Sequence, residues 1–93
     1  MQQTLETLMH TVHTEAREHM QAPTVAYDSD EGVVMYGPQS TINTVFNTVL
    51  ERLGARDVEG LAELEAADGT EDVSVDFTLQ GHRVYLTTCF ESA

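Results

Sequence analysis

The segment His10–His19, with the letters HTVHTEAREH, holds three of the four histidines of the chain. If this segment is helical, Glu6, His10 and His13 follow one another at spacings of four and three residues and project from one flank. One carboxylate and two imidazoles are ligands that Zn²⁺ accepts in proteins. The spacing therefore offers a divalent-metal site, with zinc as the expected ion, as one interpretation of this flank.

A solvated helix flank is the interpretation that we favour for the same residues. On a helical wheel Arg17 lies beside His13, and its positive charge opposes the binding of a metal cation. The metalloprotease motif HExxH is absent, because threonine follows His10. A third interpretation is a pH-sensitive contact surface, since histidine titrates near neutral pH.

His19, His82 and Cys89 are the remaining side chains that could act as acid, base or nucleophile. His19 shares the apolar side of the helical wheel, which indicates a packed or boundary residue. In a strand, His82 and Cys89 would point to opposite faces and stand about 23 Å apart, so they cannot serve one site. Neither a GxSxG motif nor a phosphate-binding glycine loop is present. An enzyme or ligand-binding protein with a pocket between helices and sheet, and His19 or His82 as acid–base group, is therefore a further alternative.

Acidic residues dominate the composition of the chain. Sixteen Asp and Glu residues oppose four basic residues, all of them arginine, and the net charge is −12. This charge repels nucleic-acid phosphates and anionic membrane surfaces, so we expect neither as a direct partner. The lack of lysine and the even spread of acids resemble the cytosolic proteins of extreme halophiles such as haloarchaea, which indicates a habitat and no chemistry.

Three features of the sequence favour a cytoplasmic protein. The first residues contain no basic segment followed by an apolar one, so a secretory signal is not expected. The longest apolar run, Val33–Tyr36, is far too short to span a membrane. A single cysteine, Cys89, excludes a disulfide within the chain and suits a reducing compartment.

The hydrophobic pattern predicts two amphipathic helices that must position these residues. In the first, from Thr4 to about Gln21, apolar residues recur every three or four positions and the helix ends before a proline. The second has Gly37 or Ser40 as its N-cap and ends at Gly54, where glycine favours a helix stop. Its apolar stripe consists of Ile42, Val45, Phe46, Val49, Leu50 and Leu53.

Alternating residues predict the strands. Thr24–Asp28 and Gly32–Tyr36 flank a turn-rich segment and form a first hairpin. Residues 57–68 fit either a helix or a strand, because their apolar residues match both periods. We expect a strand from Leu61 to Ala66, since Gly60 weakens a continuous helix.

The clearest strand signal lies near the C-terminus, where apolar and polar residues alternate on both sides of Gln80–Gly81. A two-residue turn at this dipeptide places Phe77 opposite Val84. By the same register Val75 lies opposite Leu86, so the apolar residues of both strands share one face. Register and hydrophobic pattern therefore agree on a closing hairpin.

These elements combine into an α+β fold. We expect two amphipathic helices packed on one face of a four- or five-stranded antiparallel sheet, with all of residues 1–93 in one domain. Tyr85, Thr87 and Cys89 point to the other face, which would be partly solvated and free to contact a partner. We therefore expect a cytosolic interaction or regulatory module that forms a homodimer, contacts other proteins and requires no cofactor.

The charge of the chain predicts that its stability depends on salt. Self-repulsion among the acids destabilises the folded state at low ionic strength, and multimolar KCl screens it. We expect the melting temperature, followed by circular dichroism, to rise steadily from low to multimolar KCl. A melting temperature that stayed constant over this range would contradict the prediction.

Overall fold

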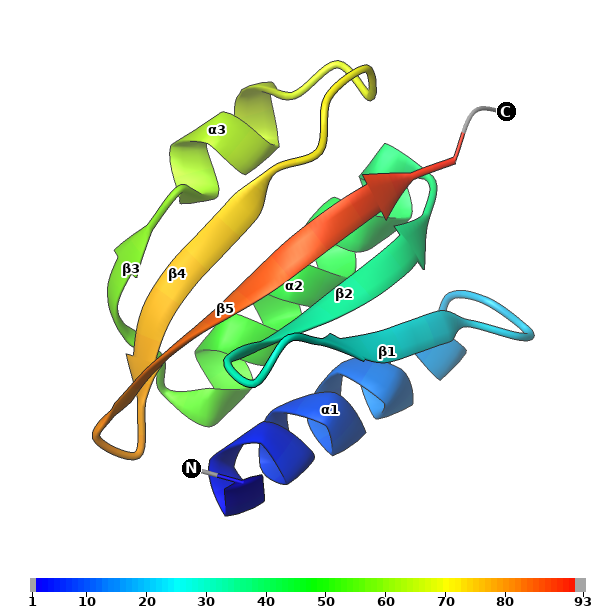
Figure 1. The fold of residues 1–93 in the computed structure, drawn as a ribbon. Coiled ribbons are helices and arrows are strands. Elements are labelled where there is room, and N and C mark those ends of the chain that lie inside the picture. Colours follow the sequence, from blue (N-terminus) through cyan, green and yellow to red (C-terminus); the bar gives the residue numbers. More distant parts are fainter. Residues whose placement is uncertain (1, 92–93) are drawn as a thin grey trace.

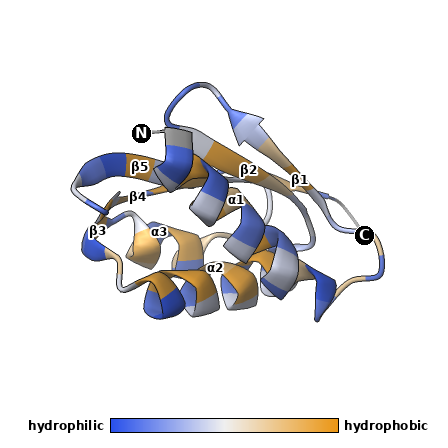
Figure 2. Cartoon of the chain, turned by 90° about the horizontal axis from the view of Figure 1, so that it is seen from below, coloured by the Kyte–Doolittle hydropathy of each residue, from blue (hydrophilic) through white to orange (hydrophobic). Residues whose placement is uncertain are grey.

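One mixed five-stranded sheet forms a layer of the protein, and three helices lie on one side of it (Figure 1, Figure 2). The computed structural model describes residues 2–91. The strands lie side by side in the order β1-β2-β5-β4-β3. In chain order the elements are α1 (Gln2–Arg17), β1 (Thr24–Asp28), β2 (Gly32–Gly37), α2 (Gln39–Leu53), β3 (Arg56–Glu59), α3 (Leu61–Ala66), β4 (Ser74–Leu79) and β5 (His82–Phe90).

The α+β class, the two long helices packed on the sheet and the closing hairpin are confirmed. β1 and β2 form the predicted first hairpin, with Asp28 paired to Gly32 beside the turn. β4 and β5 form the closing hairpin, and Phe77 pairs with Val84 as expected. Gly54 ends α2 with a φ of 64°, a left-handed conformation that glycine adopts readily.

The expectation of a wholly antiparallel sheet is wrong at the centre of the sheet. β2 and β5 run parallel, from Gly32 beside Tyr85 to Gly37 beside Phe90. Parallel neighbours cannot be joined by a tight turn, so the chain between them must cross over the sheet. α2 forms the first part of this crossover and packs on both strands.

The predicted strand Leu61–Ala66 is also wrong, because this segment is the helix α3. The strand in this part of the chain is β3, which precedes the helix. Gly60 separates the two with a φ of 95°, and a Cβ there would overlap the carbonyl oxygen of Ser74 on β4. The helical spacing of Leu61 and Leu64 therefore agrees with the observed structure, and the alternation of residues 62–66 does not. Leu64 is the buried residue of α3.

The first helix is shorter than expected, since it ends at Arg17 rather than near Gln21. The amide of His19 donates to the carbonyl oxygen of Ala16 over 3.0 Å and so tightens the last turn. Beyond this turn the chain must reach the start of β1, which follows Pro23 directly. Because α1 ends at Arg17, the residues before β1 are free to turn the chain back to the sheet.

The second helix begins differently from the two expected alternatives. Its N-cap is Pro38, with an extended backbone and no side-chain cap, rather than Gly37 or Ser40. Proline suits this end of a helix because it has no amide that would need an acceptor. The first helical bond runs from the amide of Ile42 to the carbonyl oxygen of Pro38, over 3.0 Å.

Apolar side chains from the helices and from one face of the sheet form one core. Burial of this surface is the main term that favours folding. The residues with no exposed surface are Leu8, Val12, Ala16, Val33, Met35, Ile42, Val45, Phe46, Val49, Leu64, Val75, Phe77 and Leu86.

A buried carboxylate connects the two long helices. The side chain of Glu15 on α1 is only 3% exposed, and its Oε1 lies 2.9 Å from Nε of Arg52 on α2. Arg52 itself is 60% exposed, so solvent weakens the attraction without removing it. A buried charge without a partner is unfavourable, which makes the arginine important for the packing of α1 on α2.

We expect Arg52→Gln to lower the free energy of unfolding by about 1–3 kcal/mol, because the substitution leaves the Glu15 carboxylate without its charged partner. Arg17→Gln is the matched control, since it removes an arginine at the exposed end of α1 and should change stability by less than about 0.5 kcal/mol. Urea unfolding in high salt measures both variants. If both variants lost the same free energy of unfolding, the ion pair between Arg52 and Glu15 would not be what stabilises the packing of the helices.

Candidate functional site

The face of the sheet that the helices do not contact carries the residues expected to meet a partner. In β5, Val84 and Leu86 are buried in the core, whereas the alternate residues Tyr85, Thr87 and Cys89 are half-buried on the opposite face. Residues paired across neighbouring strands share a face. By this rule the uncovered face has at its centre Ala26, Val34, Tyr36, Tyr85, Thr87 and Cys89.

The sequence did not predict that Ala26, Val34 and Tyr36 belong to this surface. Val34 lies beside Thr87, and Tyr36 beside Cys89, because β2 and β5 are parallel neighbours. Ala26 on β1 extends the same row, paired with Val34. The alternation in β2 was a signal for a two-faced strand, but nothing in the sequence identified β5 as its neighbour.

The ring of Tyr85 fills the space left by a glycine on the adjacent strand. Gly32 pairs with Tyr85, and a Cβ built on Gly32 would overlap the ring carbons of the tyrosine. Gly32 is buried, because the ring lies over its backbone. Any side chain at this position would displace the ring, so the close approach requires glycine.

Hydrogen bonds at its far end fix the orientation of Tyr85. The hydroxyl lies 2.7 Å from the backbone carbonyl oxygen of Asp28, 2.9 Å from its carboxylate and 2.8 Å from Oγ of Ser29. Ser29 has a left-handed backbone with a φ of 62° and lies in the turn between β1 and β2. Tyr85 therefore ties this turn to β5.

These contacts also change the acidity of the phenol. The hydroxyl of Ser29 lowers the pKa of Tyr85, but partial burial and the carboxylate of Asp28 raise it, so that the pKa lies above its ordinary value. Charge on Glu31 acts in the same direction as Asp28. The neutral phenol is therefore the form that the folded state prefers.

Hydroxyl groups bind one another on the side of the uncovered face that β4 forms. Oγ of Ser74 donates to Oγ1 of Thr87 over 3.0 Å, and the carbonyl oxygen of Val73 lies 3.4 Å from the same threonine oxygen. Cys89 is a half-buried free thiol. The face is thus apolar and aromatic at its centre and polar along the side formed by β4.

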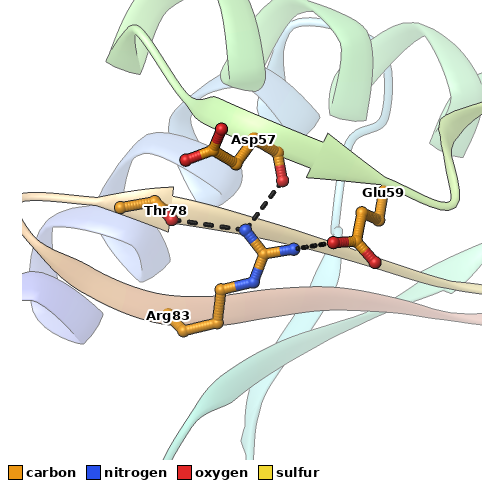
Figure 3. Close-up of polar contacts among 4 residues, drawn as sticks. All are labelled: Asp57, Glu59, Thr78 and Arg83. Atoms are coloured by element: carbon orange, nitrogen blue, oxygen red, sulfur yellow. Dashed lines mark hydrogen bonds and ion pairs between the residues drawn. The ribbon is translucent and has the colours of Figure 1, made fainter.

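Charged residues border this face. Asp28 and Asp76 pair with Gly32 and Tyr85, so their carboxylates flank the tyrosine from both sides. A cation is present toward the β3 edge, where Arg83 bridges the strands (Figure 3). A molecule that docks on the centre must therefore come close to carboxylates on the border.

The Arg83 guanidinium connects three strands at this border. Its Nη1 donates to the carbonyl oxygen of Asp57 over 2.7 Å and to Oγ1 of Thr78 over 3.2 Å, and its Nη2 lies 3.0 Å from Oε1 of Glu59 (Figure 3). Asp57 has a left-handed backbone with a φ of 51°, at an irregular point of β3. The arginine thus holds a short and irregular edge strand against β4.

The expected metal ligands Glu6, His10 and His13 are exposed along α1. Within residues 2–91, no three His, Cys, Asp or Glu side chains are grouped so that they could hold one metal ion. A zinc site at this flank stays a prediction, and it would need ligands from elsewhere. His19, expected to be packed or at a boundary, is exposed, because α1 ends before it.

A cleft of about 580 Å³ opens at one end of the protein, between the C-terminus of α2 and the turn of the closing hairpin. Neither His19 nor His82 is among its lining residues, so the cleft does not place either histidine as an acid–base group. The lining residues are Arg52, Leu53, Gly54, Arg56, Asp57, Thr78, Leu79, Gln80 and Gly81.

Comparison with known proteins adds no family to these observations. No family model, no curated protein and no solved structure matches the chain. In the part of the chain that the structure describes, no helix has the length and apolar character needed to cross a membrane. Function must therefore be inferred from the side chains and their geometry.

We expect Tyr85 to lose its proton at a higher pH than an ordinary tyrosine, and Asp28→Asn to lower its pKa. Because the folded pKa exceeds the unfolded one, the contribution of Tyr85 to the free energy of unfolding is fully present below a pH of about 10. This contribution is lost as the pH rises through the folded pKa. NMR titration of the tyrosine ring measures the shift. Asp30→Asn, which removes a charge from the same turn, is the control, and an equal effect of both variants would contradict the assigned contact.

Proposed function

We propose that this protein is a small, non-catalytic interaction module that forms a homodimer through the uncovered face of its sheet. The supporting observation is the row of half-buried apolar and aromatic residues at the centre of this face, described above. The helices cover the opposite face and leave this one uncovered (Figure 2). In a monomer, a solvent-exposed sheet face usually carries polar residues at every second position of its strands.

The chemistry of the centre suits a protein interface. Tyrosines such as Tyr36 and Tyr85 are enriched at interfaces, because one side chain supplies both apolar area and a polar group. Tyr85 is already fixed by Gly32 and by the turn at Asp28, so little of its freedom would be lost on binding. Small residues such as Ala26 allow a second sheet to approach closely.

We expect the two copies in the dimer to be related by a two-fold axis. In such a dimer the same patch meets itself, so residues near the axis contact their own copies. Val34 and Thr87 lie side by side in the central row of the face and are the residues that we place near this axis. Their apolar and hydroxyl groups can pack without leaving a charge buried.

The acidic border makes the proposed dimer dependent on salt. Asp28 and Asp76 would lie at the border of the interface in both copies, and the net charge of −12 on each chain adds to the repulsion. Multimolar salt screens both effects over distances of a few ångströms. We accordingly place the protein in the reducing, salt-rich cytoplasm of a halophile, where it would contact other proteins as a regulatory module.

The experiment is sedimentation equilibrium of the purified chain as KCl is raised to multimolar concentration. We expect a dimer whose dissociation constant falls with salt. Val34→Glu adds a charge at the centre of the face and should weaken the dimer at least tenfold, which is about 1.4 kcal/mol. Thr14→Glu, at an exposed position of α1, adds the same charge elsewhere and should leave the dimer unchanged.

A chain that remains monomeric at high protein concentration in multimolar KCl would overturn the proposal. Equal weakening by Val34→Glu and Thr14→Glu would also overturn it, since the effect would then come from net charge alone. Circular dichroism melts of both variants establish that each is folded under the conditions of the measurement.

A further inference from the structure

Three of the four basic residues of this acidic chain gather at one end of the molecule. Arg52 and Arg56 line the cleft described above. Arg83 donates to Asp57 and Thr78, which line the same cleft. In a chain with sixteen acids and four bases, this is where the basic side chains gather, and two of them are paired with Glu15 and Glu59.

The cleft is open to solvent and has the volume to take a small molecule. Its volume of about 580 Å³ lies within the usual range of roughly 300–1,000 Å³ for ligand pockets. Leu53 is half-buried and supplies apolar surface, and Leu79 adds the edge of the core. This apolar surface beside the arginines suits a ligand with one charged group and a short apolar body.

The two lining arginines differ in how much of their hydrogen-bonding capacity is already used. Arg52 forms an ion pair through its Nε with the Glu15 carboxylate, and its side chain is 60% exposed, which leaves its terminal nitrogens accessible. Arg56 is exposed and forms no ion pair within residues 2–91. Arg83 is engaged with three oxygens and acts by holding the cleft wall in place.

Negative groups near the cleft are partly neutralised. The carbonyl oxygens of Leu50 and Glu51 at the end of α2 accept hydrogen bonds from the amides of Ala55 and Gly54. Asp57 is the acidic residue among the lining residues, and its carboxylate lies on the side away from the Arg83 guanidinium (Figure 3). Arg52 is paired with Glu15, so Arg56 is the lining guanidinium without a carboxylate partner within residues 2–91.

We propose that this cleft binds a small organic anion, whose phosphate or carboxylate group is held by Arg56 and Arg52 and whose body lies over Leu53 and Leu79. A guanidinium can donate two parallel hydrogen bonds to such an oxyanion, which gives both affinity and orientation. The site is independent of the proposed dimer, because the residues that carry it lie outside the centre of the uncovered face.

The test is a titration of ¹⁵N-labelled protein with inorganic phosphate and, separately, with succinate, each at constant ionic strength set by KCl. We expect saturable shifts of the Arg56 side-chain signal and of the amides of Gly54 and Gly81 with at least one of the two probes. Saturation by phosphate alone assigns a phosphorylated ligand, and saturation by succinate alone assigns a carboxylate.

Arg56→Gln should weaken binding at least tenfold, and this variant is preferred to one at Arg52, whose loss would also disturb Glu15. Arg17→Gln is the matched control, because it removes the same charge at the far end of α1 and should leave the affinity unchanged. Shifts that grow linearly with both probes, no shifts at all, or equal losses in the two variants would overturn the proposal.

Discussion

The parallel pairing of β2 and β5 determines where the other elements lie. A tight turn cannot join these two strands, so the chain after Gly37 must leave the sheet and return before His82. It leaves as α2, which packs with α1 on one face and creates the core there. β1 of the first hairpin then lies at one edge of the sheet, and β4 with β3 lies on the other side. The second face of the central strands is left without a helix.

The sequence contains strong signals for contacts that are close along the chain. The Gln80–Gly81 turn and the alternating residues on both sides of it determine the register in which Phe77 meets Val84, and the register is correct. No comparable signal exists for β2 and β5, since their pairing depends on the whole crossover between them. β3 is short, irregular and rich in charge, so neither its length nor its composition indicates a strand.

The candidate surfaces show the same difference between contacts that are close along the chain and contacts that are distant. Alternation alone places Tyr85 opposite the core, but its contacts with Gly32 and Asp28 come from a distant hairpin and depend on the parallel register. Arg52 and Arg56 lie four positions apart, at the end of α2 and at the start of β3, but the turn of the closing hairpin that completes the cleft is far from them in sequence. The scarcity of basic residues is the one signal in the sequence, because each of the four arginines is then a candidate for a specific role.

The ring of Tyr85 occupies the place where a side chain of residue 32 would lie, and this has a consequence for how the sequence can change over evolution. Neither position can vary alone, since a larger residue at 32 would collide with the ring and a smaller one at 85 would uncover the glycine backbone. Descendants of this chain should therefore either keep the glycine–tyrosine pair or exchange both residues together. Substitutions at these two positions would be correlated even though more than half of the chain separates them.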